Sequence, residues 1–195
     1  MKIMQRLATA IGLGVLSSAA VAGAGYSSLD VTQVIQEHSN WCWAASSVDI
    51  LKWYKLNPSQ CGVVNWAFGR ADACGSGVFD WNSAANSPNS LYGDNGSVQA
   101  ILGNNGVRST PSASALTWNT IVNEVNAGHP FVMRFGWYGG GGHILVGYGY
   151  DDRNGTMMVA YMNPWPGEGY TWSTYAWTKS AAYDHTWTHS LRTTK

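Results

Sequence analysis

The sequence predicts an α+β fold in which an N-terminal helical part and a C-terminal antiparallel sheet meet at a cleft. Two observations predict it. In the first half, apolar residues recur at three- and four-residue steps, which is the spacing of helices that face a core. Beyond Pro130 the chain becomes a series of short aromatic and β-branched runs separated by turn residues, which is typical of strands. Because the helices precede the strands, we expect two separate layers.

Residues 1–24 are typical of a secretory signal peptide. Two basic residues precede an apolar run that ends in small residues, and this run is short for a bilayer-spanning helix, which needs ~20 residues. The small residues permit cleavage after Ala22 or Ala24, and cleavage after Ala24 leaves one domain, residues 25–195. We therefore expect a secreted or periplasmic protein without a membrane anchor.

The charge of the chain is balanced, with 11 basic and 11 acidic residues. Removal of residues 1–24 takes away two basic side chains, which leaves 11 − 2 = 9 basic against 11 acidic ones and a formal charge near −2. This balance offers no electrostatic basis for binding nucleic acid or an anionic membrane. We expect neither as a partner, and we expect a monomer.

The first predicted helix runs from Cys42 to about Lys55, where apolar side chains follow helical spacing. Ser39 and Asn40 precede it and are good N-cap residues. Cys42 thus falls in the first turn. Unpaired backbone N–H groups and the positive end of the helix dipole favour a thiolate over a thiol there.

The middle of the chain predicts a loop, two short helices and a linker. Residues 75–96 are rich in Gly, Ser and Asn and lack periodicity, so we expect a long surface loop of the kind that often borders a binding site. Residues 97–102 and 117–126 are predicted helices because glycine stop signals follow them. The segment RSTPSASA between them, residues 108–115, is predicted to be a linker.

Five runs in the second half predict strands: FVMRF, HILVGYGY, TMMVAYM, TWSTYAW and HTWTHSL. The turn DDRNG joins the second and third runs into a hairpin. If Arg153 is the middle of that turn, His143 lies opposite Asn163, with Cβ atoms ~5 Å apart on one face. A two-residue turn at 154–155 would instead place residue 166 opposite His143.

The chain has three cysteines, so one stays unpaired in an oxidising compartment. Cys61 and Cys74 are the natural disulfide pair, since closing the short segment between them would stabilise the fold by ~3 kcal/mol in the chain-entropy account. Cys42 is then the free thiol. A free cysteine is commonly an inert buried residue, so its surroundings decide between that role and a nucleophile.

A thiol nucleophile needs a base within hydrogen-bond reach, a group that orients the base, and donors for an oxyanion. His143 opens a predicted strand behind four glycines, and Asn163 ends the next strand before a proline. These two are the candidates for the base and its orienting group. His185 and His189 have a metal-like spacing, but four residues along a strand separate them too far to share an ion. We expect no metal and no cofactor.

Several motifs resemble those of papain-like cysteine peptidases: Gln36 six positions before Cys42, an aromatic residue directly after that cysteine, a later Gly-His strand and an Asn-Pro strand end. The segments NWCWAA, GHPFV, GGHILVGY and NPWPGEG are most similar to the bacterial avirulence-effector type and to the related double-glycine leader peptidases. The resemblance covers residues 31–190 and implies a papain-like two-layer fold. It implies that Cys42 is the nucleophile, His143 the general base and later acid, and Asn163 the orienting residue. It also implies that Gln36 donates to the oxyanion beside the Cys42 backbone N–H. Asn163 departs from the aspartate that is common in this branch, whereas papain itself has asparagine.

Tryptophan is abundant, with 11 in the chain. Trp41 and Trp43 flank the candidate nucleophile, and the resemblance implies that Trp165 and the Gly-rich loops wall the cleft. These three residues are therefore candidates for substrate binding. Plain packing in the core and on the sheet explains them equally well.

The sequence thus predicts a secreted papain-like cysteine peptidase that hydrolyses peptide bonds of a protein or peptide substrate through a thioester on Cys42. One alternative is hydrolysis of another amide, such as a peptidoglycan cross-link or a glutamine side chain, because nucleophile and base do not fix the acyl group. Another is a non-catalytic, aromatic-rich module that binds glycans or proteins, given the tryptophans and the low charge.

Overall fold

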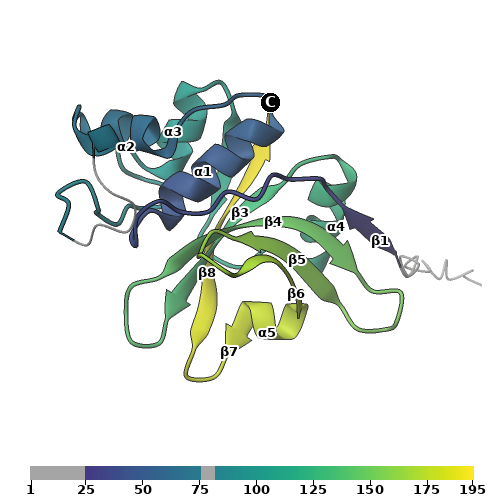
Figure 1. The fold of residues 1–195 in the computed structure, drawn as a ribbon. Coiled ribbons are helices and arrows are strands. Elements are labelled where there is room, and N and C mark those ends of the chain that lie inside the picture. The colour runs from purple at the N-terminus through teal and green to yellow at the C-terminus, as the bar shows by residue number, and fades with distance from the viewer. Residues whose placement is uncertain (1–24, 76–81) are drawn as a thin grey trace, which may run out of the picture.

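The computed structural model describes residues 25–75 and 82–195 (Figure 1). The expected signal peptide, residues 1–24, and part of the expected surface loop, residues 76–81, lie outside this range. The helices are α1 (Cys42–Trp53), α2 (Gln60–Phe68), a 3₁₀ turn (Ala73–Gly75), α3 (Val98–Asn104), α4 (Trp118–Asn126) and α5 (Tyr175–Lys179). Within the described ranges, no helix has the length and apolar character that crossing a bilayer requires.

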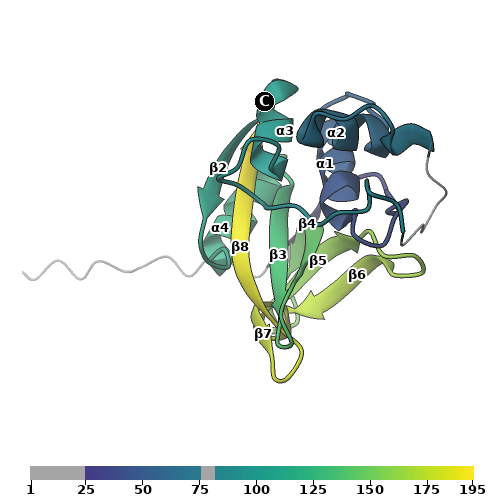
Figure 2. The same cartoon turned by 90° about the vertical axis from the view of Figure 1, so that its left-hand side faces the viewer.

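The described strands form one antiparallel sheet. Its order is β2-β8-β3-β4-β5-β6, while β1 pairs with β4 and β7 pairs with β8. Figure 2 shows β8, β3, β4, β5 and β6 side by side. The strands are β1 (Tyr26–Ser28), β2 (Arg108–Ser112), β3 (Phe131–Trp137), β4 (His143–Asp151), β5 (Met158–Asn163), β6 (Gly169–Thr174), β7 (Ser180–Ala181) and β8 (His185–Thr194). The strand that begins at His143 therefore lies in the interior of the sheet.

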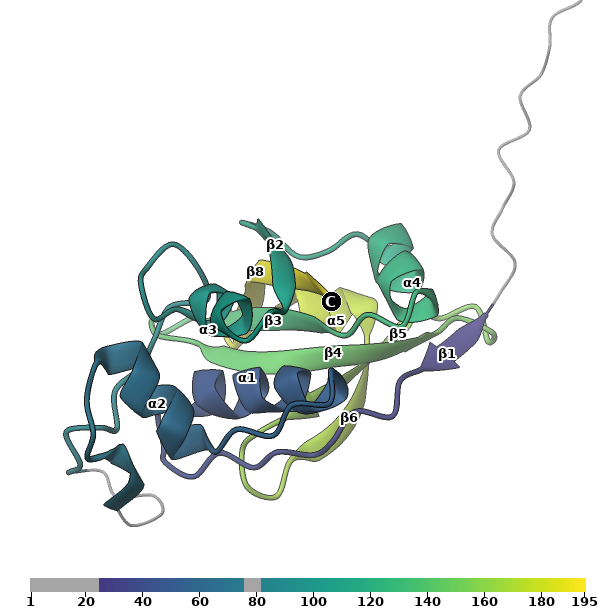
Figure 3. The same ribbon diagram turned by 90° about the horizontal axis from the view of Figure 1, so that it is seen from above.

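Helices cover both faces of this sheet (Figure 3). On one face, α1 packs over Ile144 and Val146 of β4, and α2 and α3 lie beside α1. On the other face, α4 packs over Met133 and Leu145. Successive residues of a strand point to opposite faces, so strands covered on both sides become continuous apolar runs. The predicted α+β class is confirmed, and α4 adds a cover on the second face that the prediction did not include.

The first turn of α1 lacks a side-chain cap, which makes the prediction of Ser39 or Asn40 as N-cap wrong. The N-cap is Trp41, and its side chain makes no capping hydrogen bond. Both predicted N-cap residues form hydrogen bonds with Asn86 instead. Its Nδ2 donates to Ser39 Oγ at 2.8 Å, and its Oδ1 accepts from the Asn40 backbone N–H at 2.9 Å. The first backbone N–H groups of α1 are consequently left for another partner.

Two segments differ from their predicted structure. The predicted linker at 108–115 is wrong in part, since its first residues form β2 and pair with β8 at the edge of the sheet. Pro111 hid this strand in the sequence, although an edge strand tolerates proline. The predicted strand TWSTYAW is a strand only up to Thr174, whose side chain accepts from the Trp177 backbone N–H and so begins α5.

The hairpin of β4 and β5 has a different register from the first one predicted. Asp151 pairs with Met158 beside the turn, which is the register of the two-residue turn, and a bulge then shifts the pairing so that Gly147 opposes Tyr161. His143 and Asn163 are therefore not directly opposed. Asn163 lies two positions nearer the turn than the residue that would oppose His143, a diagonal distance that side chains still bridge.

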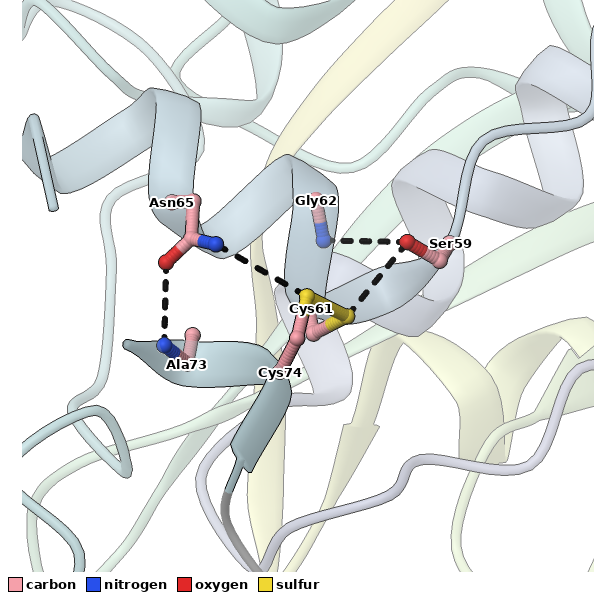
Figure 4. Close-up of a disulfide and its surroundings, with 6 residues drawn as sticks. All are labelled: Ser59, Cys61, Gly62, Asn65, Ala73 and Cys74. Atoms are coloured by element: carbon pink, nitrogen blue, oxygen red, sulfur yellow. Dashed lines mark hydrogen bonds between the residues drawn. A yellow bond between two sulfur atoms is a disulfide. The ribbon is translucent and has the colours of Figure 1, made fainter. Parts of the chain in front are cut away.

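The predicted disulfide between Cys61 and Cys74 is present and joins α2 to the 3₁₀ turn (Figure 4). Asn65 supports it, because its Nδ2 donates to the Cys74 sulfur at 3.7 Å and its Oδ1 accepts from the Ala73 backbone N–H at 3.0 Å. The Ser59 side chain caps α2 by accepting from Gly62 N. Cys42 is the free cysteine.

Asp49 is an acid buried inside α1. It is 0% exposed, and neither carboxylate oxygen has a hydrogen-bond partner among the described residues. Burial raises the pKa of Asp49 well above its ordinary value, and the Lys52 charge offsets this only in part. The native protein therefore keeps a proton on Asp49 at pH values at which the unfolded chain has lost it.

Asp49 should consequently lower the free energy of unfolding as the pH rises above about 4, the ordinary aspartate pKa, until the pH passes the raised pKa of the folded state. We expect Asp49→Asn to remove this contribution and to stabilise the protein at pH 8 by on the order of 1 kcal/mol or more. Denaturant unfolding between pH 4 and pH 8 measures the difference between the two proteins. Asp94→Asn, on an exposed loop, is the matched control. A difference that does not grow with pH would contradict the assignment.

Candidate active site

A cavity of about 580 Å³ opens where the N-terminus of α1 meets the start of β4. Five of the residues predicted for the site line it: Cys42, Trp43, His143, Asn163 and Trp165. They come from four separate parts of the chain, namely α1, β4, the end of β5 and the turn after it. The structure thus brings together the thiol, the imidazole and the carboxamide that the sequence singled out.

Cys42 is the first residue of α1 and is partly exposed. One turn later, Ser46 Oγ donates to the Ile144 carbonyl at 3.0 Å, and this buried hydrogen bond fixes α1 against β4. Ile144 follows His143, so the same bond sets the distance between α1, which begins at Cys42, and β4, which begins at His143. Serine at this position is fully buried and satisfied.

The electrostatics of Cys42 differ from those of an exposed first-turn cysteine. Burial raises the pKa of Cys42 to about 11, although the backbone amides of Ile144 and Trp43 and the charge of Arg134 lower it. The helix N-terminus therefore acts in the predicted direction, but desolvation of the thiolate outweighs it. Cys42 needs a base before it can react at neutral pH.

His143 is held by Asn163. Its Nε2 lies 2.7 Å from Asn163 Oδ1, which also accepts from the Trp165 backbone N–H at 3.0 Å. An oxygen that accepts both bonds requires Nε2 to carry the proton, so Nδ1 is the free basic nitrogen. The Trp137 ring is stacked beside the imidazole, with centroids 6.0 Å apart. The predicted pairing of His143 with Asn163 is thus present in spite of the shifted register.

Burial also lowers the pKa of His143, while the hydrogen bond to Asn163 and the charge of Glu168 raise it. A raised thiol pKa and a lowered imidazole pKa both favour the uncharged forms. The site therefore favours a neutral thiol and a neutral imidazole at neutral pH. Such a pair is ready for proton transfer to Nδ1 when a substrate carbonyl is attacked.

Gln36 is buried at the floor of the turn that precedes α1, and it is not among the residues that line the cavity. Its Nε2 donates to the carbonyls of His38 and Ser39, each at 2.8 Å. Its Oε1 is buried without a partner among the described residues. Its backbone N–H donates to Pro164 O at 2.8 Å, which ties this turn to the residue after Asn163.

The three candidate tryptophans occupy different environments. Trp41 is fully buried and donates from Nε1 to Ala85 O, so it belongs to the core rather than to the cavity wall. Trp43 is also buried but borders the cavity. Trp165 is 39% exposed and forms part of the wall on the Asn163 side. Trp165 is therefore the one of the three whose side chain a substrate can contact, and Trp43 lies behind the cavity wall.

Three lining residues escaped the sequence analysis: Arg134, Trp137 and Glu168. Arg134 had a signal, because it is a lone cation in the apolar run FVMRF. Trp137 is the last residue of β3 and Glu168 directly precedes β6, and no sequence pattern pointed to either of them. In the part of the chain that the structure describes, no group of three metal-ligating side chains occurs.

The chain is similar to one protein family and to solved structures. A model of the Peptidase_C39-like family matches residues 28–193, which is most of the chain. Among solved structures, procathepsin B S9 from Trypanosoma congolense is similar, with 13% sequence identity and a TM-score of 0.45 over 85% of this chain and 73% of that chain. A search of curated proteins found no significant match.

Proposed function

The chain belongs to the Peptidase_C39-like family of cysteine-type peptidases, and from this premise we propose that it is an exported peptidase that cleaves protein or peptide substrates through a thioester on Cys42. The observation that carries the proposal is the cavity in which a free thiol at a helix N-terminus meets an imidazole oriented by a carboxamide. The Cys61–Cys74 disulfide supports export, because disulfides persist in oxidising compartments.

In the first half of the reaction, Cys42 Sγ attacks the scissile carbonyl while His143 Nδ1 takes the thiol proton. The carbonyl oxygen becomes an oxyanion beside the uncapped start of α1, where the Cys42 backbone N–H can donate to it. Collapse of this intermediate breaks the C–N bond, and His143 gives its proton to the leaving amine. The products are a free amine and a thioester on Cys42.

In the second half, His143 Nδ1 removes a proton from water, and the resulting hydroxide attacks the thioester. The acid leaves, and the proton returns from His143 to Sγ. Asn163 keeps the ring in one tautomer throughout, because its Oδ1 accepts from Nε2. Gln36 would reach the oxyanion only after its carboxamide had released His38 O or Ser39 O. In the described arrangement it orders the turn before Cys42.

The test compares two substrates of the same chemistry. We expect signal-free protein to release new α-amino groups from casein, and an epoxide inhibitor to stop this release while modifying Cys42 alone. Mass spectrometry of the modified peptide identifies the site. Release of amines from purified cell wall with casein intact would favour the amidase instead. Hydrolysis of neither, with glycan or protein binding that survives alkylation of Cys42, would favour the binding module.

A further inference from the structure

Arg134 places a positive charge in the wall of the catalytic cavity. It lines the cavity together with Cys42 and Ile144, and it pairs with Ile144 across β3 and β4, so both side chains share the face that α1 covers. The neighbouring position on that face of β3, Val132, is apolar and fully buried. Arg134 thus lies next to the nucleophile, at a strand position where the alternation of side chains predicts an apolar core residue.

The guanidinium is only partly satisfied by the protein. Nη1 donates to Thr188 Oγ1 at 2.9 Å, and Nη2 donates to Gly141 O at 2.8 Å. A guanidinium has five N–H donors in a planar fork, so donors remain after these two bonds. Among residues 25–75 and 82–195, no carboxylate lies within ion-pair distance of Arg134. A half-buried cation without a counter-charge is costly, and an incoming carboxylate would neutralise it.

Two glycines leave room for this side chain. A Cβ atom on Gly142 would lie 2.5 Å from the Phe135 carbonyl oxygen and 2.7 Å from Arg134 Nη2. One on Gly136 would lie 2.8 Å from Thr188 Cγ2 and 3.2 Å from Arg134 Nη1. Gly142 does not have a positive φ, so close approach rather than backbone conformation accounts for the missing side chain. Gly136 and Gly142 therefore lie directly against the guanidinium, and the hydrogen bonds to Thr188 and Gly141 fix its direction.

The second charge of the cavity, Glu168, does not compete for Arg134. The charge of Glu168 raises the pKa of His143, whereas that of Arg134 lowers the pKa of Cys42 and of His189. No ion pair joins Glu168 to Arg134. Glu168 is exposed, so water screens it.

We propose that Arg134 binds a carboxylate of the substrate close to the scissile bond and makes the peptidase selective for acidic substrates. This inference rests on the proposed function, because it concerns the same cavity. The carboxylate belongs either to an aspartate or glutamate side chain or to the C-terminus of the peptide. Both have the planar geometry that an arginine fork binds through two hydrogen bonds.

The test uses pairs of fluorogenic peptides that differ only by glutamate or glutamine at one of three positions on each side of the cleaved bond. Each pair is made with a free and with an amidated C-terminus. We expect wild type to favour the glutamate peptide by on the order of 10- to 100-fold in kcat/KM at one position. Arg134→Gln should bring this ratio to one, Arg134→Lys should keep part of it, and high salt should reduce it. Arg108→Gln, an exposed arginine on β2, is the matched control and should keep the full ratio. Preference for the free over the amidated terminus, lost in Arg134→Gln, would assign the carboxylate to the C-terminus.

A purely structural Arg134, which only holds the Gly141 carbonyl, would change both peptides of a pair equally and would overturn the proposal. So would a wild-type ratio of one at every position and at the terminus. If wild type cleaves no peptide, the proposed function is wrong. Binding of the same peptide pairs to Cys42→Ala protein then decides whether Arg134 binds a carboxylate. Tighter binding of the acidic peptide that Arg134→Gln abolishes would support it, and equal binding would overturn it.

Discussion

Replacing Cys42 with alanine should lower kcat/KM for peptide hydrolysis by on the order of 10⁴-fold or more while the protein stays folded. The variant has no atom that can form the thioester, and the other two sulfur atoms are joined in the Cys61–Cys74 disulfide. The change removes one partly exposed side-chain atom at a helix start, so the core over β4 stays intact. Loss of activity would therefore report chemistry rather than unfolding.

Hydrolysis of a fluorogenic peptide gives the rate, and circular dichroism with a thermal melt checks the fold. Cys42→Ser is the matched control for shape, since it keeps a group of similar size but a far weaker nucleophile. Thiol titration should find one reactive thiol in wild type and none in either variant. Hydrolysis at the wild-type rate in Cys42→Ala would show that the cavity does not use this thiol.

The main helices and strands could be predicted because each has a clear sequence pattern. The apolar positions of α1 recur at helical steps, and β3, β4, β5 and β8 are dense in aromatic and β-branched residues. The segments whose predicted structure was wrong contain residues that favour different structures. Pro111 stands inside β2, and the aromatic run around Tyr175 suits a strand but becomes helical because Thr174 caps it. Tertiary pairing and local capping decided these cases.

The residues of the candidate site could be predicted from the sequence, but their geometry could not. Asn163 was assigned to His143 from a register centred on Arg153, whereas the hairpin has the register of the two-residue turn, which a bulge between Gly147 and Gly149 then shifts by one residue. The contact is made nevertheless, because both residues lie at the open end of the hairpin, where the side chains reach across. A bulge depends on packing from both faces of the sheet, and no local sequence pattern predicted this bulge.

The direction of the Cys42 pKa shift also needed the structure. The sequence placed the thiol at a helix N-terminus, which lowers a thiol pKa. It could not show that burial of Cys42 in the folded chain raises its pKa to about 11. The free thiol of this protein therefore depends on its base more than a first-turn position suggests.

Replacing His143 with alanine should slow alkylation of Cys42 by iodoacetamide at pH 7 by on the order of 10²- to 10⁴-fold. With a pKa near 11, Cys42 alone has very little thiolate at that pH. His143 Nδ1 provides the acceptor for the proton in wild type. Without it, labelling should rise continuously up to pH 9 and reach no plateau.

The pH dependence of wild type follows from the lowered pKa of His143. The neutral, basic imidazole persists above that pKa, so labelling should stay fast at pH 7 and fall as the pH drops through a value below 6.5, the ordinary histidine pKa. Asn163→Asp should move this fall to higher pH, because a carboxylate at the same 2.7 Å contact favours the imidazolium. Asn163→Ala removes the hydrogen bond that raises the pKa of His143, and should move the fall the opposite way.

His129 serves as the matched control, because it is a partly exposed histidine beside Glu124, away from the cavity. Its alanine variant should be labelled like wild type. If His143→Ala were labelled as fast as wild type with the same pH profile, Cys42 would be an ordinary thiol that no base activates. The stacked Trp137 and the exposed Trp165 would then be better explained as the wall of a binding groove, and hydrolysis could not be assigned to this cavity.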